Sequence, residues 1–203
     1  MTQPDETRST KIIEFWTWFE STAVSLRNNF QNALILEQLD ARIRELDPSL
    51  SWEIGPGSNE TCQFVISPNL DVSLREKARE IIDHAPVLAG WEFYSARRPK
   101  DWNYHVVIKR QEGKDQLALN ASDWKFVLLK YPDGIHEVLL QANNLPSLDD
   151  DERWQAAAVV LESILGEELL MDRIDEFQLV DQLEPRFEAS KRPIRELRDV
   201  VRV

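Results

Sequence analysis

Residues 81–99, IIDHAPVLAGWEFYSARRP, constrain the fold more than any other stretch of the chain. Ile81 and Ile82 close an apolar helical stripe, and Pro86 ends that helix because proline lacks an N–H and restricts the residue before it. Gly90 provides a pivot, and from Trp91 onward apolar and polar residues alternate as they do in a strand. The stretch therefore predicts a helix end, a turn and a buried strand.

Two helices are predicted before this stretch, at residues 11–26 and 30–46. In the first helix the apolar spacing i, i+3, i+4 and i+7 places four residues on one face: Ile12, Phe15, Trp16 and Phe19. Residues 50–54 alternate in polarity, and a second strand at 61–67 follows the turn Gly55-Pro56-Gly57-Ser58-Asn59, so the two strands are predicted to form an antiparallel hairpin.

Further elements are predicted after residue 99. Two strand pairs are expected, 104–108 with 116–119 across the polar turn 111–114, and 124–130 with 135–142 across Tyr131-Pro132-Asp133-Gly134. A helix follows at 151–165, opened by an acidic run and ended by Gly166. A short helical turn at 167–170, a strand at 173–180 and a last helix at 194–201 complete the expected order.

These elements predict an α+β fold with a mixed, largely antiparallel sheet and helices packed on one face. Residues 50–97 and residues 123–180 both follow the order strand–strand–helix–strand, which indicates either a duplicated unit or ordinary α+β recurrence. We expect one domain over residues 11–182. A flexible tail over 1–10 precedes it, and residues 183–203 form a C-terminal tail or a short helix.

Composition limits the classes of function. The 42% of hydrophobic residues and the 7 tryptophans are typical of a folded globule, and the net charge of −12 argues against nucleic acid as a partner. The single cysteine, Cys62, cannot form an intramolecular disulfide and fits a reducing compartment. The first ten residues lack the apolar core of a signal peptide, and no apolar run approaches the roughly 20 residues of a membrane helix. We therefore expect a soluble cytoplasmic protein that does not contact membranes.

The sequence contains no recognisable catalytic or metal-binding motif. His84, His105, His136 and Cys62 fall on separate predicted elements without metal-ligand spacing, so neither a metal nor a cofactor is expected. Phosphate-binding glycine loops and the G-x-S-x-G nucleophile elbow are also absent. No catalytic residue is assigned on this basis.

Charge distribution is more informative than any motif. Residues 149–188 carry 13 acidic and 3 basic side chains, whereas residues 189–203 carry 5 basic and 2 acidic ones. This asymmetry predicts either that the acidic region pairs with the basic tail, within the chain or across a homodimer, or that the acidic region binds a basic protein partner. The candidate partner-binding residues are four carboxylates and two aromatic anchors: Glu167, Glu168, Asp172, Asp175, Trp18 and Trp102.

Three short motifs carry a family resemblance. They are Phe-Trp-Thr-Trp-Phe at 15–19, Ala-Pro-Val-Leu-Ala-Gly-Trp-Glu-Phe at 85–93 with Arg98-Pro99 after it, and Leu-Gly-Glu at 165–167. The chain resembles a group of uncharacterised bacterial cytoplasmic proteins in which an aromatic first helix precedes an A-P-x-L-x-G-W strand entry. The resemblance spans about residues 12–180 and implies no activity.

Two functions from different classes are compatible with these observations. The first is a non-enzymatic bacterial cytoplasmic protein-binding module, for example an immunity-type inhibitor whose acidic half covers a basic protein. The second is a small-molecule enzyme with a carboxylate and a histidine, such as His105 or His136, in a cleft between sheet and helices. The sequence does not decide whether the chain is an enzyme.

Overall fold

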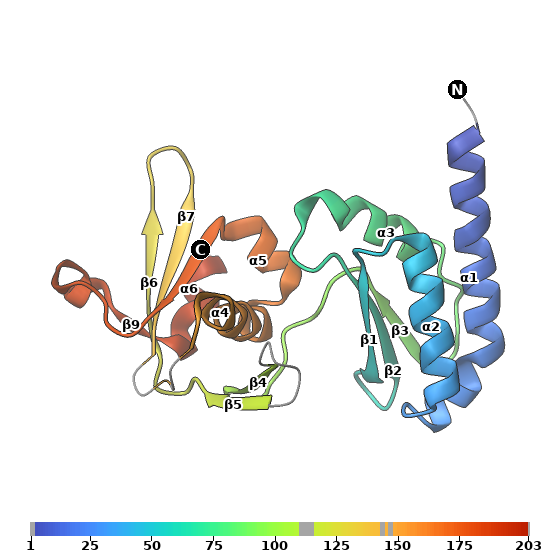
Figure 1. Ribbon diagram of the computed structural model, residues 1–203, viewed down its shortest axis with the longest axis horizontal. Coiled ribbons are helices and arrows are strands. Elements are labelled where there is room, and N and C mark those ends of the chain that lie inside the picture. The colour runs from blue at the N-terminus through green and yellow to red at the C-terminus, as the bar shows by residue number, and fades with distance from the viewer. Residues whose placement is uncertain (1–2, 110–115, 143–144, 146–147, 203) are drawn as a thin grey trace. The chain divides into compact units, whose positions relative to one another are not determined.

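The computed structural model describes residues 3–109, 116–142, 145 and 148–202 (Figure 1). The protein is α+β, as predicted, and the strands among these described residues form three sheets. The chain divides into two compact units, Met1–Arg97 and Arg98–Val203. The single domain over residues 11–182 stays a prediction.

Unit 1 contains three α-helices and a three-stranded sheet. Its elements are α1 (Gln3–Asn28), α2 (Ala33–Leu46), β1 (Ser51–Pro56), β2 (Cys62–Ser67), the 3₁₀ turn η1 (Val72–Leu74), α3 (Arg75–Asp83) and β3 (Trp91–Tyr94). Helix α1 begins at Gln3, where the sequence predicts a flexible tail over residues 1–10, and residues 1–2 of that tail lie outside the described part.

The sheet of unit 1 is covered by helices on one face (Figure 1). Its strand order is β1-β2-β3, with β2 antiparallel to β1 and parallel to β3. Phe64 and Ile66 of β2 point into the helices, where Phe64 meets an aromatic cluster on α1: Phe15, Trp16 and Phe19. The indole Nε1 of Trp16 donates to the carbonyl of Ile81 at 2.7 Å, which ties α1 to α3.

A carboxylate fixes the β1–β2 turn to strand β3. Glu92 accepts hydrogen bonds from the backbone N–H of Ser58 at 3.0 Å and from the hydroxyls of Ser58, Thr61 and Tyr94. These hydrogen bonds, with Ser58 contributing most, lower the pKa of Glu92 to about 2. The folded state therefore stabilises the charged form of Glu92 relative to the protonated form.

This network predicts acid sensitivity. Because the folded pKa of Glu92 lies below its ordinary 4.5, the contribution of Glu92 to stability is complete above about pH 4.5 and is lost as the pH falls toward 2. Glu92→Gln should lower the melting temperature at pH 7 and flatten its decline between pH 4.5 and 2. Thermal melts across that range measure both effects, and Glu20→Gln on the exposed side of α1 is the control. Equal pH profiles for wild type and Glu92→Gln would contradict the prediction.

Unit 2 contains the remaining two sheets. Its elements are β4 (His105–Lys109), β5 (Gln116–Asn120), β6 (Lys125–Lys130), β7 (His136–Gln141), α4 (Asp150–Leu165), α5 (Glu167–Arg173), β8 (Glu176–Val180), η2 (Pro185–Ser190), β9 (Arg192–Pro193), η3 (Ile194–Glu196) and α6 (Leu197–Arg202). The last four elements occupy the segment 183–203, for which the sequence predicts a tail or a short helix. The predicted turn 111–114 lies outside the described residues.

The main sheet of unit 2 repeats the topology of unit 1. Its strand order is β8-β7-β6-β9, with β7 antiparallel to β6 and parallel to β8, while β4 and β5 pair separately. Helices α4 and α5 lie between β7 and β8 in the chain, and α4 packs against β8 and β4. The order β6-β7-α4-β8 thus matches β1-β2-α3-β3, so both predicted strand–strand–helix–strand sets are present.

Both ends of α4 are fixed by local interactions. Asp149 and Glu152 form a capping box, in which the Asp149 carboxylate accepts from the Glu152 N–H at 2.8 Å and Glu152 accepts from the Asp149 N–H at 3.2 Å. Gly166 ends the helix with φ +80° and ψ 155°, a conformation that glycine adopts without strain. Helix α4 therefore begins and ends at the residues that the sequence indicates.

Candidate functional site: an acidic and aromatic surface on unit 2

The predicted acidic residues differ in their exposure. Glu168 and Asp172 are exposed on α5, where their i, i+4 spacing places them on one side of the helix. Asp175 is exposed just before β8 and accepts a hydrogen bond from the His136 N–H at 2.8 Å. Glu167, in contrast, is 0% exposed, so it cannot contact a partner as predicted.

The two predicted aromatic anchors lie in different units. Trp18 is half-buried in unit 1, where its Nε1 donates to Gln38 at 3.2 Å and the Arg42 guanidinium lies 4.9 Å from its ring. Helix α2 thus covers part of this indole. Trp102 of unit 2 is 39% exposed and borders a pocket, with Lys100 Nζ 4.9 Å from its ring. Both tryptophans are far from the predicted carboxylates in the sequence.

A third tryptophan, which the sequence does not single out, is more exposed than either. Trp154 on α4 is 55% exposed, and its ring lies 5.6 Å from that of Phe177 on β8. Asp150 and Asp151 precede it by one helical turn, so exposed carboxylates share its side of α4. The apolar spacing to Ala157, Ala158 and Leu161 places Trp154 on the buried stripe, which explains why periodicity gives no signal for its exposure.

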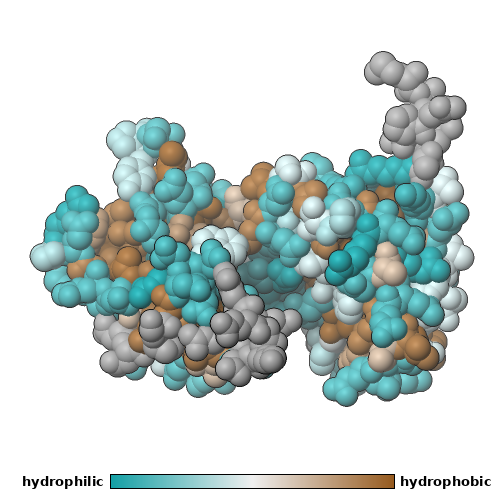
Figure 2. Space-filling model, in the orientation of Figure 1, coloured by the Kyte–Doolittle hydropathy of each residue, from teal (hydrophilic) through white to brown (hydrophobic). Residues whose placement is uncertain are grey.

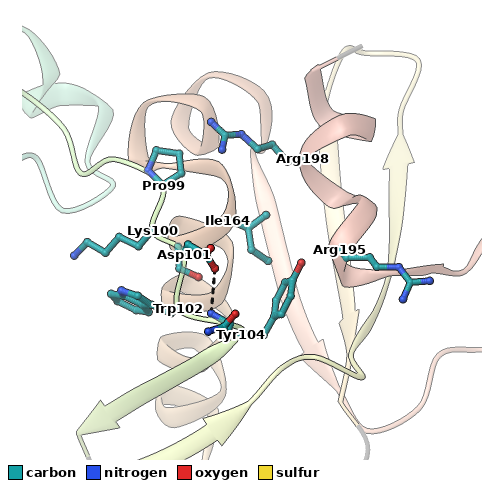
Figure 3. Close-up of a pocket in the computed structure, with 10 residues that line it drawn as sticks. Pro99, Lys100, Asp101, Trp102, Tyr104, Ile164, Arg195 and Arg198 are labelled. Carbon is teal, nitrogen blue, oxygen red and sulfur yellow. Dashed lines mark hydrogen bonds between the residues drawn. The ribbon is translucent and has the colours of Figure 1, made fainter. Parts of the chain in front are cut away.

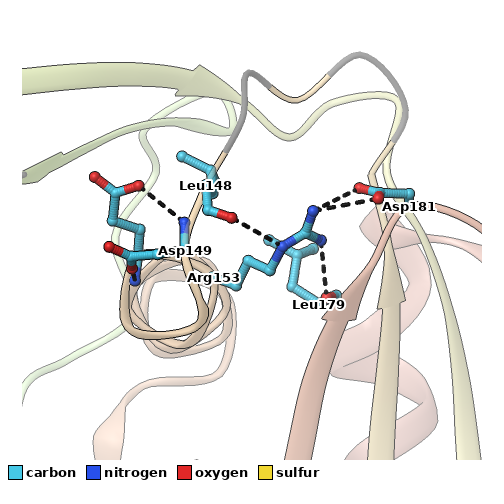
Figure 4. Close-up of polar contacts among 6 residues, drawn as sticks. Leu148, Asp149, Arg153, Leu179 and Asp181 are labelled. Carbon is cyan, nitrogen blue, oxygen red and sulfur yellow. Dashed lines mark hydrogen bonds and ion pairs between the residues drawn. The ribbon is translucent and has the colours of Figure 1, made fainter.

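Strand β8 is an outer strand of its sheet, and a basic side chain holds α4 against it. The Arg153 guanidinium donates to the carbonyls of Leu148 and Leu179 at 3.4 Å each and to the Asp181 carboxylate at 3.0 and 3.2 Å (Figure 4). These contacts fix the first turn of α4 at the end of β8. Trp154, the next residue on α4, therefore lies against β8, where its ring contacts that of Phe177.

We call the acidic surface the exposed carboxylates of α4 and α5 and of Asp175 before β8, together with the Trp154–Phe177 pair. Its carboxylates are Asp150, Asp151, Glu168, Asp172 and Asp175. Glu176 is left out because it pairs with Glu137 in the sheet and therefore points to the face opposite that of Phe177. The face of the molecule in Figure 2 is largely hydrophilic, with separate apolar groups in each unit. A surface that combines a large aromatic side chain with carboxylates suits a partner that brings cationic side chains.

The two histidines that the sequence offers as an acid or base, His105 and His136, lie on strands of different sheets. His105 is exposed on β4, with Nδ1 2.9 Å from the Asn103 carbonyl oxygen. His136 borders a pocket of about 240 Å³ whose other polar lining side chains are Lys130 and Arg173. Burial raises the pKa of the Cys62 thiol. Within the described part of the chain, no three His, Cys, Asp or Glu residues are placed to hold a metal ion.

A buried carboxylate lies on the face of the main sheet of unit 2 that is opposite the Trp154–Phe177 pair. Glu137 accepts hydrogen bonds from the Tyr131 hydroxyl at 2.7 Å and from Gln178 Nε2 at 3.0 Å, beside a pocket of about 220 Å³. The hydrogen bond to Glu137 raises the pKa of Tyr131. Because both carboxylate oxygens of Glu137 already accept hydrogen bonds, we interpret this group as a structural bridge between β6, β7 and β8.

Comparison of the chain with protein-family models, curated proteins and solved structures found no match. Its class is therefore defined by the fold and the surface alone, as a two-unit α+β protein with an acidic and aromatic surface on unit 2. The resemblance carried by residues 15–19 and 85–93 stays a prediction.

None of the described helices combines the length and the apolar character that crossing a bilayer requires.

Proposed function

We propose that this chain is a non-enzymatic, bacterial cytoplasmic binding protein that engages a basic protein through its acidic surface. An immunity-type inhibitor that covers the basic site of another protein is a concrete version of this function. The observation that carries the proposal is Trp154, a tryptophan 55% exposed on a rigid helix, with Asp150 and Asp151 one turn before it. Tryptophan is enriched among the residues that dominate binding energy at protein interfaces.

Electrostatics supports the same partner. The segment 149–188 holds 13 of the chain's 36 acidic residues and only 3 of its 24 basic ones. A surface of one sign attracts a partner of the opposite sign and raises the association rate, an effect that salt screens. Glu167 is buried and is therefore left out of this surface. Trp18 is also left out because its indole interacts within unit 1.

The test begins with capture of partners by the tagged full chain from a lysate of its own host, at low and at high salt. The captured protein is purified, and its binding kinetics are measured for wild type and variants. Neutralising Glu168, Asp172 and Asp175 together should lower the association rate at least about tenfold at low salt. Trp154→Ala should weaken binding about 30-fold, chiefly by faster dissociation. An aromatic side chain that becomes buried at the centre of an interface contributes about 2 kcal/mol or more to the binding free energy.

Two matched controls test whether binding depends on the acidic surface itself or only on the net charge and the number of exposed tryptophans. Glu14→Gln, Glu20→Gln and Glu37→Gln together remove three exposed charges from unit 1, and Trp102→Ala removes an exposed tryptophan elsewhere on unit 2. Both controls should bind as wild type does. A partner whose binding ignores Trp154→Ala and the triple neutralisation would overturn the proposal, as would capture of only a second copy of this chain.

A further inference from the structure

A pocket of about 340 Å³ on unit 2 is lined by three segments that are distant in the sequence (Figure 3). Residues 99–104 form one wall, Ser163 and Ile164 of α4 form the floor, and Arg195 and Arg198 come from the C-terminal segment. The Lys100 N–H donates to the Ser163 carbonyl at 2.8 Å, which fixes the wall to the end of α4. The pocket volume falls within the range typical of small-molecule sites.

The charge of the lining is opposite to that of the chain as a whole. Lys100, Arg195 and Arg198 contribute three cations against the single carboxylate of Asp101, in a chain of net charge −12. Neither Arg195 nor Arg198 has an ion pair or hydrogen bond from its side chain to any residue that the structure describes. By comparison, Arg153 and Arg186 of the same unit both pair with carboxylates.

Arg198 carries the strongest signal for an anionic ligand. Its Nε atom is shielded from solvent and has no hydrogen-bond partner within the described residues, so this guanidinium is partly desolvated and unpaired. Figure 3 shows its side chain extending toward Pro99 above the pocket, whereas Arg195 directs its guanidinium outward on the opposite side. A desolvated cation attracts an anion more strongly than a cation in bulk water does.

Aromatic side chains add a second kind of recognition. Asn103 and Tyr104 both have positive φ, 48° and 61°, and the His105 N–H donates to the Trp102 carbonyl at 2.9 Å, so residues 102–105 form a tight turn. This turn places the Tyr104 ring between Ile164 and the Arg195 stem (Figure 3). Trp102 also lines the pocket and is 39% exposed, and because Lys100 Nζ lies over one side of its ring, a planar group would stack on the opposite side.

We propose that this pocket binds a small organic phosphate that carries a planar ring. Arg198 holds the phosphate with the Tyr104 hydroxyl as a hydrogen-bond donor, and Arg195 adds positive charge to the lining without contacting the phosphate. Guanidinium groups match phosphate oxygens in geometry, and an excess of cations in the lining favours a dianion over a monoanion. Trp102 and Tyr104 contact the ring of the ligand.

Phenyl phosphate is the probe, titrated into the full chain by calorimetry at low salt. It should bind at least about tenfold more tightly than inorganic phosphate or benzoate, and phenol should show no measurable binding. Arg198→Gln should weaken the binding of phenyl phosphate at least about tenfold, because a charge-assisted hydrogen bond is lost. Trp102→Ala should bring phenyl phosphate to the affinity of inorganic phosphate.

Arg202→Gln is the matched control, since Arg202 is an exposed arginine on α6 outside the lining, and it should leave binding unchanged. Arg195→Gln provides a second variant should Arg198→Gln fail to fold, because Arg195 is exposed. No binding of phenyl phosphate at millimolar concentration, or equal losses in the Arg198, Arg195 and Arg202 variants, would overturn the proposal. Trp154→Ala should not affect this titration, which separates the outcome from that of the proposed protein-binding function.

Discussion

Phe64→Ala is expected to lower the free energy of unfolding by about 3–5 kcal/mol, the largest stability effect that we predict for unit 1. Phe64 is 0% exposed at the centre of the β1-β2-β3 sheet. Its ring centroid lies 4.9 Å from that of Phe19 and 6.1 Å from those of Phe15 and Trp16. Alanine would leave a cavity that the three rings on α1 cannot close. The free energy of unfolding therefore falls for two reasons: the buried ring atoms are lost, and a cavity remains in their place.

Urea unfolding followed by circular dichroism and tryptophan fluorescence measures this effect. Val24→Ala on α1 is the control, because Val24 is 72% exposed and its truncation should change stability by no more than about 0.5 kcal/mol. A loss below about 1 kcal/mol for Phe64→Ala would show that α1 moves in to fill the cavity. The aromatic cluster would then be less rigid than its packing indicates.

The helix that supplies these rings was predictable from the sequence because its signal is local. The spacing of Ile12, Phe15, Trp16 and Phe19 places all four on one face, and all four are buried. Turn residues and helix ends are local signals too, and Gly166 ends α4 where the sequence indicates. The same reasoning placed strands β1 to β8 within a few residues of their observed bounds, whereas the two-residue strand β9 was not predicted.

The topology of the two units follows from such local signals together with chain connectivity. A tight turn makes β1 and β2 antiparallel, as it does β6 and β7, and a helical crossover then returns the next strand parallel to the second one. The division at residues 97–98 has no such local signal. It depends on which elements pack together, and a sequence pattern does not specify this.

The candidate sites depend on long-range packing, and there the sequence was less informative. Glu167 follows a helix-ending glycine like any solvated first-turn carboxylate, yet it is fully buried. Trp154 has the spacing of a buried residue, yet more than half of its side chain is exposed. The pocket joins Trp102 to Arg198, nearly a hundred residues apart, and no spacing rule connects them.

Gly166→Ala is the second large effect that we predict, with a loss of about 2–5 kcal/mol in the free energy of unfolding. Gly166 has φ +80° and ψ 155°, a region that is costly for any residue with a Cβ atom. A Cβ there would also lie 2.7 Å from Cδ and 3.0 Å from Cγ of Pro99. Both backbone strain and overpacking therefore oppose alanine at this position.

Gly134→Ala separates these two causes by urea unfolding. Gly134 also has positive φ, +91°, but a Cβ there would meet nothing within 4 Å, so its variant reports backbone strain alone. Gly166→Ala should be the more destabilised of the two, because the close contact with Pro99 adds to the backbone strain. Equal losses would mean that Pro99 yields without cost. Pro99 lines the proposed phosphate pocket. A larger loss for Gly166→Ala would therefore also indicate that Pro99 is fixed against the end of α4, so that both position the pocket for its ligand.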